Sequence, residues 1–125
     1  MKEIISTDKA PAAIGPYSQA TVYNGIIYCS GQIPLNPATM EIVGEDVTTQ
    51  AKQVMANLKS VLEAAGSDFS KVLKCSIFLD SMDDFAAVNE VYGRFFDSNP
   101  PARETVAVQT LPKNVMVEIS CIAYR

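Results

Sequence analysis

The sequence predicts an α+β fold in which two helices cover one face of a mixed β-sheet. The prediction depends on a hairpin-like pair of β-rich segments, two segments with helical apolar periodicity, and alternating apolar strands between and after them. The expected order of elements is ββαβαββ. The 125 residues suit one domain, residues 1–125, and leave no room for a second core.

The N-terminal part of the chain is predicted to form a β-hairpin. Segments 17–23 and 26–30 are rich in β-forming residues and flank Asn24-Gly25. This dipeptide favours a tight turn because both central positions of a type I′ turn need a positive φ. A short strand is expected before it, at Glu3–Ile5, and a loop after it, at residues 31–37, which contain glycine, prolines and asparagine.

The first helix is predicted between Asp46 and Gly66. Asp46 can accept a hydrogen bond from the first turn, and Gly66 provides a stop signal. Apolar residues recur between them at spacings of three and four, which is the pattern of one helical face. They are Val47, Ala51, Val54, Met55, Leu58, Val61, Leu62 and Ala65.

A strand and a second helix are predicted next. In residues 73–79 the odd positions, from Leu73 to Leu79, are apolar and alternate with the even ones, as expected for a strand. Ser81 and Asp84 have the spacing of a capping box, and an apolar helical face runs over residues 85–96. Pro100-Pro101 prevents this helix from continuing.

The last two strands are predicted at residues 105–110 and 115–124. In the final strand the odd-numbered side chains should meet the helices, while the even-numbered ones form an opposite face that is apolar apart from Glu118. Phe78 is expected on that opposite face too. Since no helix remains to cover it, the sequence predicts a partner chain there.

Composition excludes several classes of function. A net charge of −4 argues against a nucleic-acid surface, which needs clustered Lys and Arg. The chain has no histidine, which excludes Ser-His-Asp and Cys-His nucleophiles and His-ligated zinc. Cys29, Cys75 and Cys121 lack zinc or redox spacing and are expected to be buried free thiols. We therefore expect no metal and no cofactor.

No apolar segment reaches the roughly 18 residues of a membrane span. The N-terminal residues lack the uninterrupted apolar stretch of a signal peptide. We therefore expect a cytoplasmic protein without a membrane partner.

Polar residues at three positions are candidates for chemistry. Arg103 follows Pro100-Pro101-Ala102, whose stiff backbone would present a guanidinium for two-point binding of a carboxylate. The alternative is a surface arginine or a local ion pair. Glu118, inside an apolar strand, has either a functional task or a cross-strand ion pair. Asn89, placed on the apolar side of the second helix, is open to a structural role.

Separated segments also form a pattern that spans nearly the whole chain. They are Ala10-Pro11-Ala12-Ala13-Ile14-Gly15-Pro16-Tyr17-Ser18-Gln19, Ser30-Gly31-Gln32-Ile33-Pro34, Asn89-Glu90-Val91-Tyr92 with Phe95-Phe96, and Pro101-Ala102-Arg103 followed by Leu111-Pro112-Lys113 and Val117-Glu118-Ile119. In these segments and their spacing the chain resembles the RidA (YjgF-like) family.

The resemblance implies a chorismate-mutase-like fold, assembled as a homotrimer with active sites in the clefts between subunits. It also implies hydrolysis of reactive 2-imino acids, 2-iminobutanoate and 2-iminopropanoate, to 2-keto acids and ammonia. The catalytic residues would be Arg103, which binds the substrate carboxylate, and Glu118, which positions or activates the attacking water.

The remaining substrate-binding residues are implied in the same way. Backbone groups of Gly31 and Thr105 would hold the imine end of the substrate, and Tyr17 would pack over it. Ser30 and Asn89 would line or support the cleft.

The chain departs from the family pattern directly after the arginine. Many members have a small residue and then cysteine, whereas this chain has Glu104 and Thr105. In a strand Glu104 points away from Arg103 and need not neutralise it. Thr105 can replace cysteine if that position works through its backbone, so the departure bears on the substrate range more than on the reaction.

Imine hydrolysis suits a chain without histidine. The protonated imine carbon is already electrophilic, so the protein only has to hold the substrate and aim a water molecule at it. Other functions remain open: a non-catalytic regulatory trimer that binds small carboxylates at Arg103, an RNA-directed ribonuclease or translation inhibitor, and a chaperone-like holdase.

Overall fold

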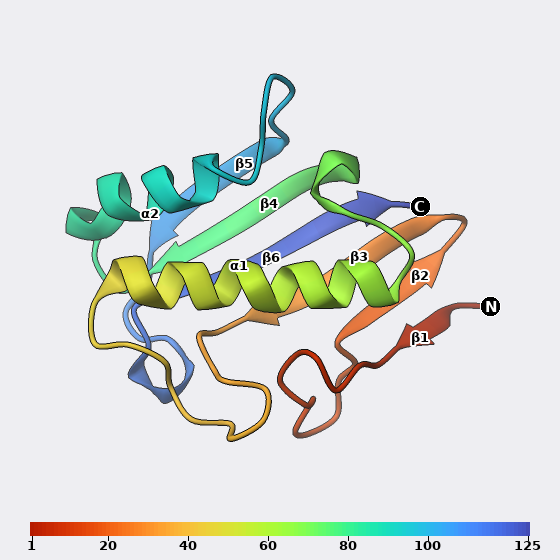
Figure 1. Cartoon of the computed structure of the whole chain (residues 1–125), viewed down its shortest axis with the longest axis horizontal. Helices are drawn as coiled ribbons and strands as arrows, with labels where there is room; N and C mark the ends of the chain where they lie inside the picture. The colour runs from red at the N-terminus through yellow and green to blue at the C-terminus, as the bar shows by residue number, and fades with distance from the viewer.

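A computed structural model describes residues 1–125 as a six-stranded mixed sheet with two helices on one face (Figure 1). The sheet order is β1-β2-β3-β6-β4-β5; β4 and β5 are parallel and the other neighbours antiparallel. This confirms the predicted α+β class. The elements are β1 (Glu3–Ile5), β2 (Ala20–Tyr23), β3 (Ile26–Gln32), α1 (Val47–Ala64), β4 (Val72–Leu79), α2 (Phe85–Gly93), β5 (Ala102–Ala107) and β6 (Val117–Tyr124).

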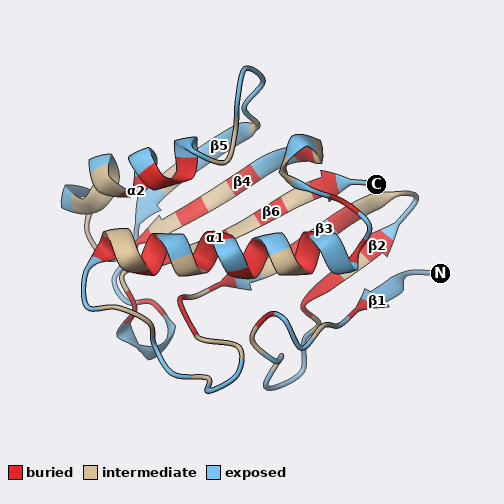
Figure 2. Ribbon diagram, viewed as in Figure 1, coloured by how far each residue is buried: buried red, intermediate tan, exposed pale blue.

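Helix α1 follows its predicted bounds closely. Asp46 accepts a hydrogen bond from the Thr49 backbone N–H at 2.8 Å, and Gly66 has a φ of 80°, which favours glycine. Every residue of its predicted apolar stripe is buried against the sheet (Figure 2). The odd-numbered residues from Val115 to Ala123 are buried as well, so the core lies between this sheet face and the helices.

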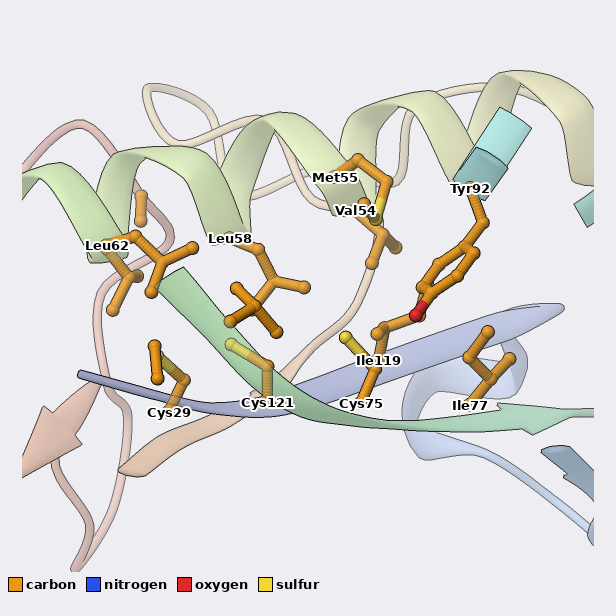
Figure 3. Close-up of a cluster of buried hydrophobic side chains, with 14 of the residues drawn as sticks. Cys29, Val54, Met55, Leu58, Leu62, Cys75, Ile77, Tyr92, Ile119 and Cys121 are labelled. Carbon is orange, nitrogen blue, oxygen red and sulfur yellow. The ribbon is translucent and has the colours of Figure 1, made fainter. Parts of the chain in front are cut away.

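The three cysteines lie side by side in that core (Figure 3). Cys29 on β3 and Cys75 on β4 are the direct cross-strand neighbours of Cys121 on β6. All are free and buried, as predicted. Burial raises the pKa of Cys75 to about 11, so this thiol stays protonated and behaves as a small apolar side chain.

Strand boundaries differ from the sequence prediction at β5. The strand begins at Ala102, not Thr105, because parallel pairing with β4 starts at Lys74 and Ala102. It ends at Ala107, short of the predicted Thr110. Arg103 is therefore the second residue of an edge strand.

Strands β6 and β4 differ in smaller ways. Strand β6 begins two residues later than predicted, because Lys113 and Asn114 adopt positive φ and the chain is still turning. Leu73 belongs to the predicted alternation of apolar residues, but it is exposed. A register shift between Val72 and Lys74 buries Val72 in its place.

The second helix begins and ends differently from the prediction. Ser81 accepts from the Asp83 backbone N–H at 3.1 Å and starts a 3₁₀ turn, so the predicted capping box with Asp84 is wrong. Helix α2 starts only at Phe85 and ends at Gly93. Phe95 and Phe96 lie beyond it and pack on Phe69, with ring centroids 5.2 and 5.5 Å apart.

The sheet face opposite the helices is left open. Phe78 lies on it directly beside Glu118, as predicted. Tyr28 is 50% exposed there, and Tyr23 and Tyr124 are exposed too. An exposed apolar sheet face of this kind is typical of a surface that binds another chain.

Neither helix is long and apolar enough to cross a membrane.

Candidate functional site

The predicted site residues fall into two separate places in the chain. Tyr17, Ser30, Gly31 and Glu118 line one cavity of about 620 Å³, here called the glutamate pocket. Its walls also include Pro11, Ala12, Ile14, Gln19, Gln32, Ile33, Leu35, Met40, Pro112 and Lys113. These residues come from the N-terminal loop, from β3 and its following loop, and from the chain before and within β6.

Glu118 is a half-buried carboxylate that packs directly on Gly31. A methyl group on Gly31 would lie 2.8 Å from the Glu118 carboxyl carbon, so only glycine allows this approach. Desolvation raises the pKa of Glu118. Glu118 is absent from all ion pairs of the chain, which excludes the cross-strand ion pair considered as its alternative role. An unpaired, desolvated carboxylate in a cavity is a candidate general base.

Ser30 connects β3 to the loop that carries Tyr17. Its hydroxyl donates to the Ser18 carbonyl at 2.6 Å, and its backbone N–H donates to the Gln19 carbonyl at 2.9 Å. Tyr17 itself is 54% exposed at the edge of the pocket. The ring is therefore placed where it can cover a bound molecule, while Ser30 holds the loop in place.

Gln19 and Asn57 support the walls of the pocket and were not singled out from the sequence. The Gln19 side chain is 3% exposed; it accepts from the Thr7 N–H at 2.6 Å and donates to the carbonyls of Thr7, Ala10 and Pro11. A buried amide with so many partners fixes the loop it binds.

The Asn57 amide fixes the opposite wall, because it donates to the carbonyls of Ile33 and Leu35 at 3.1 and 3.0 Å. The sequence feature that could have pointed to these two residues is a polar residue inside an apolar pattern. Gln19 stands in a β-rich segment, and Asn57 stands beside the apolar stripe of α1.

Arg103 lies elsewhere, on the helix-covered side of β5. It is the direct strand neighbour of Cys75, whose side chain faces the core, and its guanidinium reaches toward α2. There it donates to Asn89 Oδ1 at 2.5 Å and lies over the rings of Phe85 and Tyr92, with its central carbon 5.6 and 5.2 Å from their centroids.

No carboxylate pairs with Arg103, which excludes the local ion pair considered as its alternative role. Asn89 lies on the same face of α2 as Phe85 and Tyr92, as predicted, and it is exposed there and bound to the guanidinium. A cavity of about 460 Å³ opens beside these two residues, with Pro100 and Pro101 in its wall. Asp97 also lines this cavity, but it does not form an ion pair with Arg103.

Residues 104 and 105 lie on opposite sides of β5. Glu104 faces the open side of the sheet, where it hydrogen-bonds Ser76 and pairs with Lys74 at 3.1 Å. It does not neutralise Arg103, as predicted. Thr105 is the strand neighbour of Ile77, and its hydroxyl is buried without a hydrogen-bond partner. Its side chain lines neither of the two cavities.

One chain therefore does not bring Arg103 and Glu118 together. Glu118 shares the open face of the sheet with Phe78, whereas Arg103 shares the helix-covered side with Cys75. No group of three or more His, Cys, Asp or Glu residues is arranged to hold a metal ion. The geometry places a carboxylate pocket and an arginine without an anionic partner on opposite sides of one sheet.

Comparison with known proteins gives consistent matches over the whole chain. A family profile described as Endoribonuclease L-PSP matches residues 7–125. Protein DfrA of Myxococcus xanthus is 56% identical over 124 residues, which are 98% of this chain and 95% of that protein. A Capra hircus protein named 2-iminobutanoate/2-iminopropanoate deaminase is 48% identical over 123 residues, 98% of this chain and 90% of that protein. The crystal structure of RidA from an Antarctic Psychrobacter is 44% identical and superposes with a TM-score of 0.94, covering 98% of this chain and 99% of that one.

Proposed function

Because this chain belongs to the endoribonuclease L-PSP (YjgF/RidA) family, we propose that it is an imine deaminase acting on small 2-imino acids. The products are the corresponding 2-keto acids and ammonia. The observation that carries the proposal is the unpaired, half-buried carboxylate of Glu118 in a cavity beside Gly31. The deaminase name of the 48% identical relative supports the choice of reaction.

The active site is formed by two copies of the chain. Arg103 and Glu118 lie on opposite sides of the sheet, so a substrate bound between them needs Glu118 from one copy and Arg103 from the next. The open apolar face with Tyr28 supplies a surface on which copies associate, and three copies around one axis give three equivalent clefts. The homotrimer expected from the sequence is therefore part of this proposal.

Substrate binding begins with the carboxylate. The guanidinium of Arg103 carries no anionic partner and forms two parallel hydrogen bonds to the substrate carboxylate. Backbone groups of Gly31 and Thr105 hold the imine end, and the Tyr17 ring covers the substrate. Closure by Tyr17 keeps bulk water away and strengthens the electrostatic interactions inside the cleft.

Glu118 moves the protons of the reaction. As the water oxygen bonds to the carbon of the protonated imine, Glu118 accepts a water proton and the C=N π electrons move to nitrogen. Glu118 then returns that proton to the nitrogen of the tetrahedral intermediate. The C–N bond breaks with its electron pair on ammonia, and the hydroxyl proton passes through Glu118 to ammonia, which leaves as ammonium.

The experiment is a direct turnover assay. An amino-acid oxidase generates 2-iminobutanoate or 2-iminopropanoate in situ, and formation of the 2-keto acid is followed with and without this protein. We expect faster keto-acid formation with the protein, and the buffer rate with Arg103→Ala. An unchanged rate with the wild-type protein contradicts the proposal.

The same preparation discriminates the other functions. Binding of a 2-keto acid without turnover would indicate a carboxylate-binding regulator. RNA binding that weakens steeply with salt would indicate a nucleic-acid function, which the net charge of −4 disfavours. Holdase activity that survives loss of Arg103 would indicate a chaperone.

A further inference from the structure

We propose that Phe85 and Tyr92 are positioning residues that hold the Arg103 guanidinium flat and aim its free edge at the substrate carboxylate. The inference rests on the proposed function only in assigning a carboxylate to Arg103. It assigns a role to two aromatic residues through their contact with Arg103.

The contacts around Arg103 come from one stripe of α2. Phe85, Asn89 and Tyr92 stand four and three residues apart, so they lie on the same face of the helix. All three contact the guanidinium: Asn89 Oδ1 accepts from Nη1 at 2.5 Å, and the ring centroids of Phe85 and Tyr92 lie 5.6 and 5.2 Å from Cζ.

The chemistry of this stripe matches the two kinds of surface that a guanidinium presents. Its faces are weakly hydrated and stack on aromatic rings, while its edge carries the N–H donors. The two rings lie within cation–π distance of the guanidinium carbon, and the neutral amide of Asn89 accepts from one N–H. Since an amide does not cancel the charge, the positive charge and the remaining donors stay available for a carboxylate.

Tyr92 is itself held rigidly. It is 5% exposed, extends from α2 toward the sheet beside Cys75, and contacts Phe96 with a centroid distance of 4.8 Å (Figure 3). Its hydroxyl is buried beside the Cys75 thiol. The contact with Arg103 is made by the ring, whose centroid lies 5.2 Å from Cζ.

A long arginine side chain on an exposed edge strand loses conformational freedom when it binds a ligand. The aromatic stripe removes part of that freedom beforehand, so less is lost on binding. Removing either ring should therefore weaken carboxylate binding more than it slows the chemical step.

The test compares Phe85→Leu, Tyr92→Leu and Tyr92→Phe with Phe69→Leu as the matched control. Phe69 is a partly buried aromatic residue that packs on Phe95 and Phe96 and does not contact Arg103. Calorimetry measures the Kd of 2-oxobutanoate, which needs no turnover, and the imine assay measures KM and kcat. NMR follows the Arg103 Nε–H resonance, which the ring currents of Phe85 and Tyr92 shift.

We expect each leucine variant at Phe85 or Tyr92 to raise Kd and KM roughly three- to tenfold with kcat changed less than about twofold, the size of a partly exposed cation–π contact. The Arg103 resonance should move in both. Tyr92→Phe should retain wild-type Kd and resonance, and Phe69→Leu should change neither.

Two results overturn the proposal: an unchanged Kd and Arg103 resonance in Phe85→Leu and Tyr92→Leu, or a wild-type protein that binds no 2-keto acid. A wild-type protein that binds 2-oxobutanoate but hydrolyses no imine would refute the deaminase alone. The Kd values would then still decide the role of the two rings.

Discussion

Arg103 and Glu118 lie on opposite sides of the same sheet, although both were predicted to act on one substrate. Arg103 is aligned with Cys75 on the helix-covered side, and Glu118 with Phe78 on the open side. The proposed association of copies through the open face accounts for this separation, because it lets Glu118 of one copy meet Arg103 of another.

Replacing Arg103 should abolish substrate capture while leaving the fold intact. Charge-assisted hydrogen bonds contribute about 1.5–3 kcal/mol each. Losing two of them in Arg103→Ala should lower kcat/KM by at least roughly a hundredfold, at about 1.4 kcal/mol per factor of ten. Arg103→Lys should recover only part, because a point charge cannot form the paired geometry. Imine hydrolysis, Tm and oligomer mass on both variants check this; full activity in Arg103→Ala contradicts the assigned role.

Glu118→Gln should lose turnover and gain stability at neutral pH. Desolvation raises the pKa of Glu118, so folding disfavours its ionised form. That penalty is absent at a pH below the pKa of Glu118 in the unfolded chain, and it is complete above the higher pKa of Glu118 in the folded chain. The stability gain of Glu118→Gln should therefore shrink toward acidic pH. The raised pKa also places the acid limb of kcat/KM above that of an ordinary glutamate. Thermal unfolding from pH 4 to 8 and a pH–rate profile measure both effects, and equal stability of the two proteins at every pH would refute the first.

Gly31→Ala should displace the Glu118 carboxyl group. The added methyl group would lie 2.8 Å from the Glu118 carboxyl carbon. We expect lower activity and a lower free energy of unfolding in this variant. A double-mutant cycle with Glu118→Ala isolates the clash, because the methyl group should cost much less once the carboxylate is gone. Equal costs in the two backgrounds would show that the contact is unimportant.

Tyr28→Glu should separate the copies. Tyr28 is 50% exposed near the middle of the open face, so the charge costs little in an isolated chain but is buried in an assembly. Light scattering should give about three times the 13.5 kDa chain mass for the wild-type protein and one chain mass for the variant. Ala56→Glu, on the exposed side of α1, is the control and should remain assembled. A wild-type monomer at micromolar concentration contradicts the trimer.

Much of the fold was predictable because its signals are local. A pattern of a few neighbouring residues predicts each of three features: the Asn24-Gly25 turn, the cap at Asp46 and the apolar stripe of α1. The alternation in β6 likewise assigned Glu118 to the open face. The side of the sheet on which Arg103 lies was not predictable. It depends on parallel pairing with Cys75, a residue far away in the sequence.

The support of the site was harder to predict than its reactive groups. Glu118 stands out as a charge in an apolar strand, but the partners of Gln19 and Asn57 are loop carbonyls that no local pattern specifies. The contact of Phe85 and Tyr92 with Arg103 could not be predicted for a similar reason. Phe85 and Tyr92 have the spacing of core residues, and only the packing of α2 against β5 reveals their contact with a guanidinium.

Subunit complementation tests the two-copy active site most directly. Arg103→Ala and Glu118→Gln are each expected to be nearly inactive, but a trimer containing both variants can pair an intact Glu118 with an intact Arg103 from the neighbouring copy. Random mixing by co-expression should restore up to about a quarter of the wild-type sites, because each site draws its two residues from different chains. Activity well above the sum of the two variants is the predicted result. Activity no greater than that sum, in trimers shown by mass to contain both variants, would contradict the shared site.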